Sequence, residues 1–300
     1  MKTIIVPTDF SSYAGKAMDF AVMLAIQAKA KIILLHVCEL YDYRFSRNKT
    51  IIKEHNSNVI NDSNSKLDNL KNEIKNRENI EIVTRLYNGN VVESIIEAAS
   101  INEADLIIMG SLGETGLRRT ILGSKVAETI SKSFVPVMAV PFNYNMTRTR
   151  EILVALNDPN EELSVLQPVF DLAELFHAQV TVAIFTDADN DAPGYIEDAR
   201  NISTIQKKLI KLFHNENVKS IHLSGDDFQE VLQNFVNTKG IDLLAMMTHK
   251  RNVVQSLFNK SMTQMMSYHT NVPLLSIQAQ LSTSDKVEKT ITSSVKSFWD

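Results

Sequence analysis

Four glycines are concentrated between residues 110 and 123 of a chain that contains only nine glycines in 300 residues. Gly110 directly follows an apolar run, and Gly123 precedes Ser124 and a helical pattern; the other two glycines are Gly113 and Gly116. Glycine allows positive φ angles and lets a ligand approach the main chain without an intervening Cβ. A strand, a glycine-rich loop and a helix in this order therefore favour a site for a phosphate-bearing ligand.

The helix expected after Gly123 offers unpaired backbone N–H groups and the positive end of its dipole to an anion. Ser124 has two open roles, phosphate ligand or N-cap of the helix, and the two are compatible. Arg118 and Arg119 lie inside the loop, where they can reach a phosphate or remain solvated surface charges. The alternative for the whole loop is a plain connection between a strand and a helix.

A second polar position stands at the end of the first apolar run. Asp9 either contacts a ligand or caps the helix that we expect over residues 12–28. His36 lies in the next apolar run, where a packed histidine with a hydrogen-bond partner is expected. Cys38 follows that run and is expected to be a small buried residue.

Strands and helices alternate along the first half of the chain. We expect strands at 2–7, 31–37, 80–87, 104–109 and 135–140, and helices at 12–28, 51–77, 91–101 and 123–133. The strands are almost continuous apolar runs, which is typical of a parallel sheet buried on both faces. Crossover helices make such a sheet doubly wound. The Asn- and Ser-rich residues 56–66 are predicted to form a loop or a frayed helix end.

The second half of the chain repeats the first. Residues 151–158 resemble 2–9, and an expected helix at 163–176 and an apolar run at 179–185 follow. Further on, a constant offset of 137 residues relates Asp105 to Asp242, Ser124 to Ser261, Pro136 to Pro273 and Val140 to Ile277. Such an offset indicates a duplicated domain.

We therefore expect one domain at 1–143, a second at 150–280, a short polar linker between them, and a tail at 281–300. The last strand of each copy, at 135–140 and 272–277, would be an exposed edge that needs a partner. Pairing these two edges would create a pseudo-dimer within one chain, and a homodimer is a further possibility.

Composition narrows the class of protein. Lys and Arg number 31 against 35 Asp and Glu, so there is no basic excess for a nucleic-acid groove. The single cysteine excludes an intramolecular disulfide and a Cys-based zinc cluster, and it favours a reducing compartment. The first residues lack a signal-peptide core, and no run approaches the roughly 18 apolar residues of a membrane span. We expect a cytoplasmic protein with neither nucleic-acid nor membrane partners.

The spacing Gly-x2-Gly-x9-Gly-Ser, formed by Gly110, Gly113, Gly123 and Ser124, resembles the motif of nucleotide-binding universal stress proteins. The likeness extends to three apolar segments, IIVPTDFS at 4–11, LLHV at 34–37 and VPVMAV at 135–140. It covers the whole first half and, at lower fidelity, the second half. The chain therefore resembles a tandem member of the universal stress protein family.

This resemblance implies two α/β domains of the adenine nucleotide alpha hydrolase-like type. Each would be an open sheet of five parallel strands in the order 3-2-1-4-5 with helices on both faces. That order reverses between strands 1 and 4, and ligands of open α/β sheets bind at such reversals. The implied ligand is ATP in the first domain, with any Mg²⁺ held largely by the phosphates.

The resemblance also assigns the residues of the site. Asp9 and the backbone of Val37 would contact the adenine, with Pro7 and Thr8 lining its pocket. The ribose and phosphates would be held by Gly110, Gly113, Gly123 and Ser124.

The second copy departs from this motif. The offset of 137 puts Met247, Lys250 and Lys260 at the positions of the three motif glycines, and only the serine, Ser261, is retained. Side chains at these positions predict loss of ordinary ATP binding in the second half. The basic residues there can instead form an anion site. Asp158 stands where Asp9 stands in the first copy.

Two functions of different classes remain open. One is an ATP-binding regulatory protein of the stress response; the other is a non-enzymatic dimerisation or partner-binding module that no longer depends on nucleotide. An enzyme with rapid turnover is not expected, because the sequence shows no assembled base, nucleophile or pair of metal-binding carboxylates. At most, slow ATP hydrolysis is expected.

Overall fold

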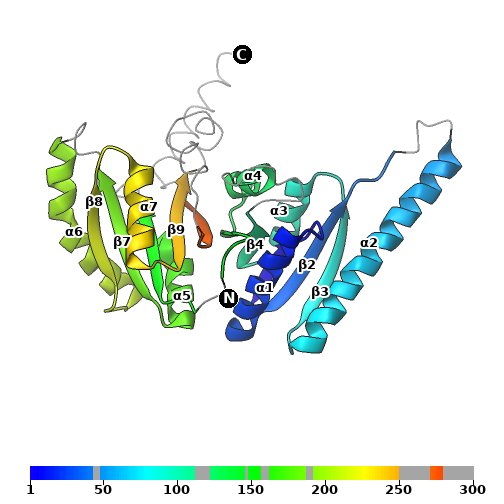
Figure 1. Cartoon of the computed structure of the whole chain (residues 1–300), viewed down its shortest axis with the longest axis horizontal. Coiled ribbons are helices and arrows are strands. Elements are labelled where there is room, and N and C mark those ends of the chain that lie inside the picture. Colours follow the sequence, from blue (N-terminus) through cyan, green and yellow to red (C-terminus); the bar gives the residue numbers. More distant parts are fainter. Residues whose placement is uncertain are drawn as a thin grey trace, which may run out of the picture.

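The computed structural model describes residues 1–42, 48–111, 122–145, 148–156, 162–186, 192–249 and 271–279. Within these residues the strands form one sheet of ten, in the order β3-β2-β1-β4-β5-β10-β9-β6-β7-β8. Figure 1 shows the two halves of this sheet side by side, with the first half in blue to green and the second in green to red. None of the described helices is long and apolar enough to cross a membrane.

The described residues of the first half form five strands and four helices. They are β1 (Thr3–Pro7), α1 (Ser12–Ala28), β2 (Lys31–Cys38), α2 (Lys49–Arg77), β3 (Ile82–Asn88), α3 (Val91–Ile101), β4 (Leu106–Gly110), α4 (Ser124–Lys132) and β5 (Val137–Val140). All neighbouring strands of this half are parallel. The expected order 3-2-1-4-5 is therefore confirmed.

The second half follows the same plan. Its described elements are β6 (Glu151–Leu156), the 3-10 turn η1 (Leu163–Leu166), α5 (Gln167–Phe176), β7 (Gln179–Thr186), α6 (Ala192–Phe213), β8 (Lys219–Ser224), α7 (Phe228–Lys239), β9 (Leu243–His249) and β10 (Leu274–Ala279). These strands are again parallel to one another. Their spatial order mirrors that of the first half about the β5–β10 junction.

The two halves meet through their last strands. β10 pairs antiparallel with β5, with Leu275 opposite Met138 and Ser276 opposite Val137. The pairing expected between the last strands of the two copies is thus observed. An edge that would be open in a single copy is closed by the other copy.

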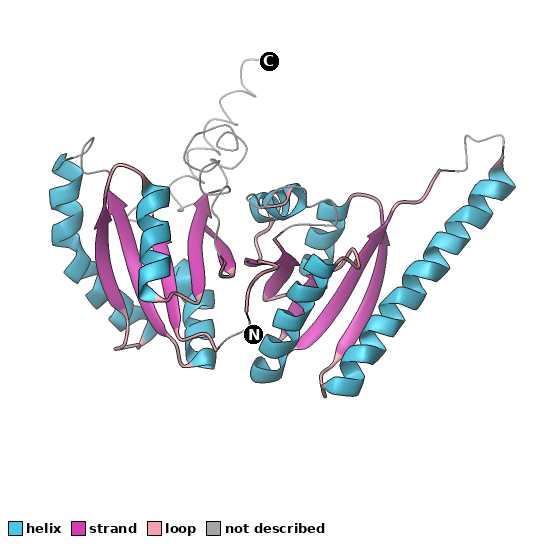
Figure 2. Ribbon diagram, in the orientation of Figure 1, coloured by secondary structure: helices cyan, strands magenta, loops and turns pink. Residues whose placement is uncertain are grey.

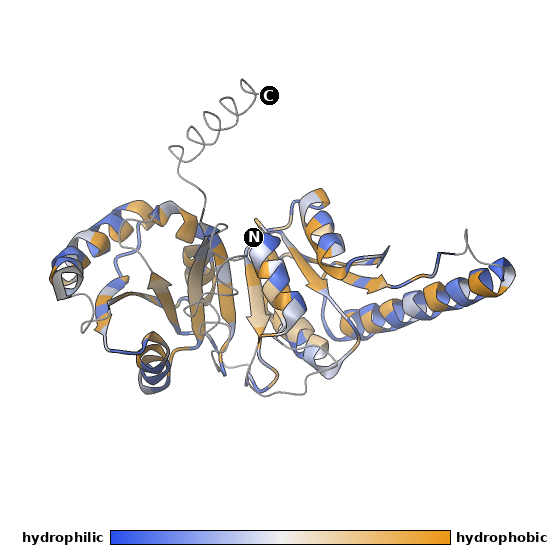
Figure 3. Cartoon of the chain, turned by 90° about the horizontal axis from the view of Figure 1, so that it is seen from above, coloured by the Kyte–Doolittle hydropathy of each residue, from blue (hydrophilic) through white to orange (hydrophobic). Residues whose placement is uncertain are grey.

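Helices cover both faces of the sheet (Figure 2). One core is continuous across the two halves: it contains Phe20 of α1 and Leu67 of α2 as well as Phe170 of α5 and Leu209 of α6. On the opposite face, α3 and α4 build one cluster in the first half, and α7 builds another in the second. The apolar colouring of the strands in Figure 3 agrees with this burial on both faces. The two copies therefore share a core on one face and keep separate cores on the other.

Two expectations about helices are corrected. Residues 56–66 are neither a loop nor a frayed end but lie inside α2, where Ser63 is buried and Leu67 packs into the core. The expected helix at 163–176 begins as the 3-10 turn η1, and the α-helix starts only at Gln167. Pro168 accounts for this boundary, because proline is tolerated in the first turn of an α-helix and not in its interior.

An aspartate at equivalent positions of the two halves, Asp105 and Asp242, connects two neighbouring strands of the sheet. Asp105 Oδ2 accepts hydrogen bonds from the backbone N–H groups of Lys2 and Thr3, at 2.5 and 2.8 Å. Asp242 Oδ2 accepts the equivalent bonds from Arg150 and Glu151, at 2.7 and 3.0 Å. Each carboxylate thus joins the residue before a fourth strand to the start of a first strand. The correspondence between the two copies extends to individual hydrogen bonds.

Replacing Asp105 with alanine should lower the free energy of unfolding by about 1 to 2 kcal/mol, because two N–H groups lose a charged acceptor. Asp242→Ala should cause a similar loss in the second half. Urea unfolding of both variants measures these changes. The Asp105→Asn variant keeps one side-chain oxygen, so its free energy of unfolding should fall less. An equal fall in Asp105→Asn and Asp105→Ala would contradict the hydrogen-bond explanation.

Candidate functional site

The candidate site lies where the strand order reverses, between β1 and β4. Ile4 pairs with Leu106 and Ile5 with Ile107. From this pairing, β1 runs on to Pro7 and β4 runs on in the same direction to Gly110. The carboxyl ends of β1 and β4 therefore meet at one edge of the sheet, as ligand sites of open α/β sheets require.

Gly110 brings the end of β4 against the first turn of α1. A Cβ at this position would lie 2.6 Å from the carbonyl oxygen of Tyr13 and 2.8 Å from its carbonyl carbon. No side chain fits into this space without moving the helix backbone. Gly110 is thus required for packing, whether or not a ligand is bound.

The residues on the two sides of the glycine-rich loop are hydrogen-bonded to each other. The backbone N–H of Gly123 donates to the carbonyl of Ser111 at 2.6 Å, and the N–H of Ser111 donates to Val140 at 2.9 Å. Gly123, which has no side chain to form a capping bond, is the N-cap of α4, and Ser124 is the first residue of the helix. The capping role considered for Ser124 is therefore wrong. Ser124 is exposed at the start of the helix.

The loop itself lies outside the described residues. It includes Gly113, Gly116, Arg118 and Arg119. Their assignment to phosphate binding therefore stays a prediction.

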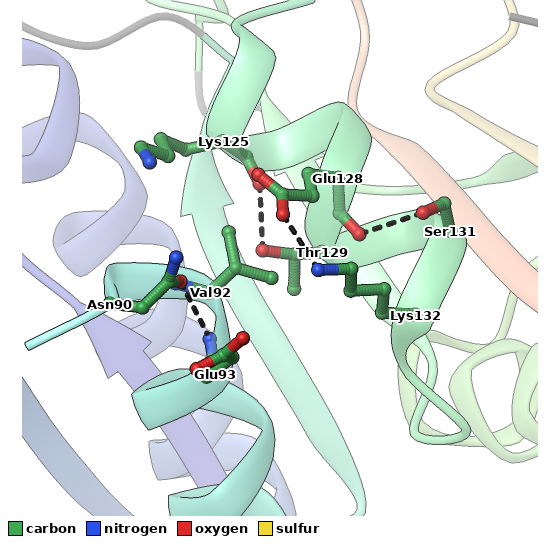
Figure 4. Close-up of polar contacts among 8 residues, drawn as sticks. All are labelled: Asn90, Val92, Glu93, Lys125, Glu128, Thr129, Ser131 and Lys132. Atoms are coloured by element: carbon green, nitrogen blue, oxygen red, sulfur yellow. Dashed lines mark hydrogen bonds and ion pairs between the residues drawn. The ribbon is translucent and has the colours of Figure 1, made fainter. Parts of the chain in front are cut away.

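Figure 4 shows hydrogen bonds of Thr129, Ser131 and Lys132 within α4. Thr129 Oγ1 donates to the carbonyl of Lys125 at 2.7 Å, and Lys132 Nζ bonds Glu128 Oε1 at 2.8 Å. The hydrogen bond from Lys132 lowers the pKa of the Glu128 carboxyl, and the same bond raises the pKa of Lys132. Asn90 caps the neighbouring helix α3 by accepting from two backbone N–H groups. The charges of Glu128 and Lys132 are thus paired with each other.

The turn between β1 and α1 carries the acidic residue of the site. Asp9 is exposed, and its Oδ1 accepts the backbone N–H of Ser11 at 3.0 Å. Ser11, rather than Asp9, caps α1, because Ser11 Oγ accepts the N–H of Ala14 at 3.2 Å. The capping role considered for Asp9 is therefore wrong.

The other adenine-side candidates lie on the same strands. Pro7 ends β1, and Thr8 is buried, with its N–H donating to the carbonyl of Leu35 at 2.8 Å. Val37, near the end of β2, is half-buried and pairs with Tyr87 of β3. The described members of the candidate set therefore all lie at the carboxyl ends of β1, β2 and β4 or at the start of α4.

His36 and Cys38 have the surroundings expected for packed residues. His36 Nδ1 is 2.8 Å from the carbonyl oxygen of Thr8, so this nitrogen carries the proton and donates. Cys38 is buried, and its Sγ contacts the carbonyl of Tyr87 at 3.3 Å. Burial raises the pKa of the Cys38 thiol. The environment of Cys38 therefore favours an unreactive thiol.

Phe10 has a role at this edge of the sheet that no sequence pattern indicates. This residue has a φ of 63°, and its ring lies 4.5 Å from the ring of His36. Lys66 of α2 places Nζ 5.7 Å from the centre of the Phe10 ring. A polar segment expected to be a loop thus supplies a helical residue to the edge of the candidate site.

The second copy differs at the position equivalent to Gly110. Met247 is 1% exposed and belongs to the shared core, whereas Gly110 abuts the backbone of Tyr13. β9 also continues past this point to His249. The other departures, at Lys250, Lys260 and Ser261, lie outside the described residues, as does Asp158.

The fold and the reversal of strand order define a tandem, doubly wound α/β protein. The sequence model of the universal stress protein family matches this chain twice, at residues 1–141 and at residues 148–278. The chain therefore belongs to the universal stress protein family, as a member with two copies of the family domain.

Individual relatives agree with this membership. Universal stress protein MJ0577 of Methanocaldococcus jannaschii is 29% identical over 153 residues, which cover 46% of this chain and 94% of the relative. Universal stress protein MJ0531 of the same organism is 27% identical over 146 residues, covering 46% of this chain and 81% of the relative. The solved structure of a universal stress protein from Archaeoglobus fulgidus superposes with a TM-score of 0.72 at 15% identity, over 92% of this chain and 98% of that one. The last comparison shows a shared fold across both halves.

Proposed function

We propose that the protein binds ATP in its first domain and acts as a nucleotide-dependent regulator of the stress response. The observation that carries this proposal is the reversal of strand order: β1, which leads to Asp9, pairs with β4, which ends at Gly110, and Gly123 at the start of α4 is hydrogen-bonded to Ser111. The spacing of Gly110, Gly113, Gly123 and Ser124 supports it, because that spacing resembles the motif of the family's nucleotide-binding members.

In the described part of the site, the start of α4 offers main-chain N–H groups to the phosphates. The start of α4 presents the positive end of a helix dipole, and Ser124 adds an exposed hydroxyl. The adenine would lie against Val37, Pro7 and Thr8, with Asp9 at its edge. Such a site binds and orients a nucleotide, and Mg²⁺ would be bound mainly by the phosphates themselves.

Calorimetric titration of nucleotide-free protein with ATP should show one site per chain. Gly113→Val should abolish this binding at millimolar ATP, because a branched side chain would stand where the main chain approaches the phosphates. Lys250→Ala changes the equivalent position of the second copy and should leave the stoichiometry and affinity unchanged. An absence of binding heat for the wild-type protein at millimolar ATP would refute the proposal.

A second candidate function is favoured by the β5–β10 junction. Strands that pair between copies can serve as an interaction module without any nucleotide. Under this alternative, Gly113→Val would preserve cellular function, whereas it would abolish function under the first proposal. We place both functions in the cytoplasm and include a homodimer among the assemblies to be tested.

A further inference from the structure

Phe10 adopts a backbone conformation that its surroundings must maintain. Five described residues other than glycine have positive φ angles, and four of them, Lys29, Glu103, His177 and His214, lie within two residues of the end of a helix. Left-handed residues are ordinary at helix ends. Phe10 instead precedes a helix, in the turn that carries Asp9. For a bulky residue this conformation persists only when the neighbouring structure holds it.

Contacts from β2 and α2, and one hydrogen bond within the turn, hold the turn in place. The Phe10 ring packs on the His36 ring of β2 with centres 4.5 Å apart, while His36 Nδ1 donates to the carbonyl of Thr8 at 2.8 Å. The N–H of Phe10 donates to Thr8 Oγ1 at 3.0 Å. From α2, Lys66 lies over the Phe10 ring and is itself fixed by an ion pair with Asp62 at 2.7 Å. Residues on both sides of Asp9 are thus fixed to β2.

We propose that Phe10 and His36 are positioning residues for the nucleotide site. Their ring contact and the hydrogen bond to Thr8 keep the β1–α1 turn in its strained conformation, and this sets the direction of the Asp9 carboxylate before a ligand arrives. The inference rests on the proposed function, and it assigns the turn to the adenosine end of the nucleotide. A site whose turn is already ordered binds its ligand more tightly, because less conformational entropy of the turn is lost on binding.

The test compares adenosine, AMP and ATP as ligands of the wild type and of Phe10→Ala and His36→Leu, each by calorimetry. Both substitutions should lower the affinity for all three ligands by the same factor, about tenfold, which corresponds to about 1.4 kcal/mol of binding free energy. The factor is common because the three ligands share the adenosine end. Phe10→Tyr keeps the ring, and His36→Asn keeps an N–H donor near the Nδ1 position; both should recover most of the affinity.

The control variant is Phe213→Ala. It removes an aromatic contact of similar kind in the second half, where Phe213 stacks on Phe170 at 3.8 Å. This variant should lose stability and keep wild-type affinity for the three ligands. Weaker binding in Phe10→Ala therefore cannot be ascribed to reduced stability alone.

The outcomes separate this inference from the proposed function. A wild-type protein that binds none of the ligands refutes the proposed function itself. A wild-type protein that binds ATP, with Phe10→Ala and His36→Leu equally tight, overturns only the positioning role. A loss of affinity that grows with the number of phosphates also overturns it, because the turn would then act on the other end of the ligand.

Discussion

Gly110→Val should destabilise the protein by about 3 kcal/mol, an effect at the upper end for overpacked sites. Any Cβ at this position would lie 2.6 Å from the carbonyl oxygen of Tyr13, and valine adds two further methyl groups. The first turn of α1 would have to move, although it is held by the Ser11 cap. Urea unfolding measures the change in free energy.

Gly15→Ala is the matched control for this variant. Gly15 lies in α1 close to Tyr13, but a Cβ there would meet nothing within 4 Å. Alanine should stabilise the helix by about 0.5 to 1 kcal/mol, because glycine is the less favourable residue in a helix interior. If Gly110→Val unfolded at the same urea concentration as the wild type, the close contact between β4 and α1 would be refuted.

Leu275→Glu should uncouple the two halves of the molecule. Leu275 is fully buried in the shared core and pairs with Met138 across the junction between β5 and β10. A carboxylate without a partner in this position should cost at least ~3 kcal/mol. We expect one cooperative unfolding transition in the wild type and two separate transitions in the variant.

The control for this variant introduces the same charge on the surface. Leu212 on α6 is 46% exposed, so Leu212→Glu should change the free energy of unfolding by less than about 0.5 kcal/mol. Hydrogen exchange adds a local readout, because amides of β5 should lose protection in Leu275→Glu and keep it in Leu212→Glu. Unchanged protection of β5 would show that the junction does not depend on Leu275.

The sheet could be predicted from the sequence because its strands are continuous apolar runs. Runs such as 31–37 and 104–109 are buried on both faces and have few alternative interpretations. The constant offset between the copies then predicted the junction, since it identified the two last strands as equivalent edges. The locations of Asp9 and Gly110 at one edge followed from the strand order that the resemblance implied.

Other features depend on contacts that no local pattern reveals. The middle of α2 is rich in Asn and Ser, and its burial is limited to Ser63, Leu67 and Ile74, so its helical periodicity is weak. The left-handed Phe10 is held by residues of β2 and α2, and phenylalanine itself gives no signal of positive φ. Gly110 also makes room for the backbone of α1, a requirement that the sequence pattern does not reveal. Its expected contact with a ligand stays a prediction.

Joining the two copies in one polypeptide has a consequence for how they can evolve. In a symmetric pair of identical subunits, every substitution occurs on both sides of the interface at once. Here the two halves are encoded separately. Met247 can therefore fill the core in the second half, while the equivalent position of the first half keeps Gly110, which has no side chain. Each half can therefore change its own residues at the carboxyl ends of its strands while the pairing of β5 with β10 is kept.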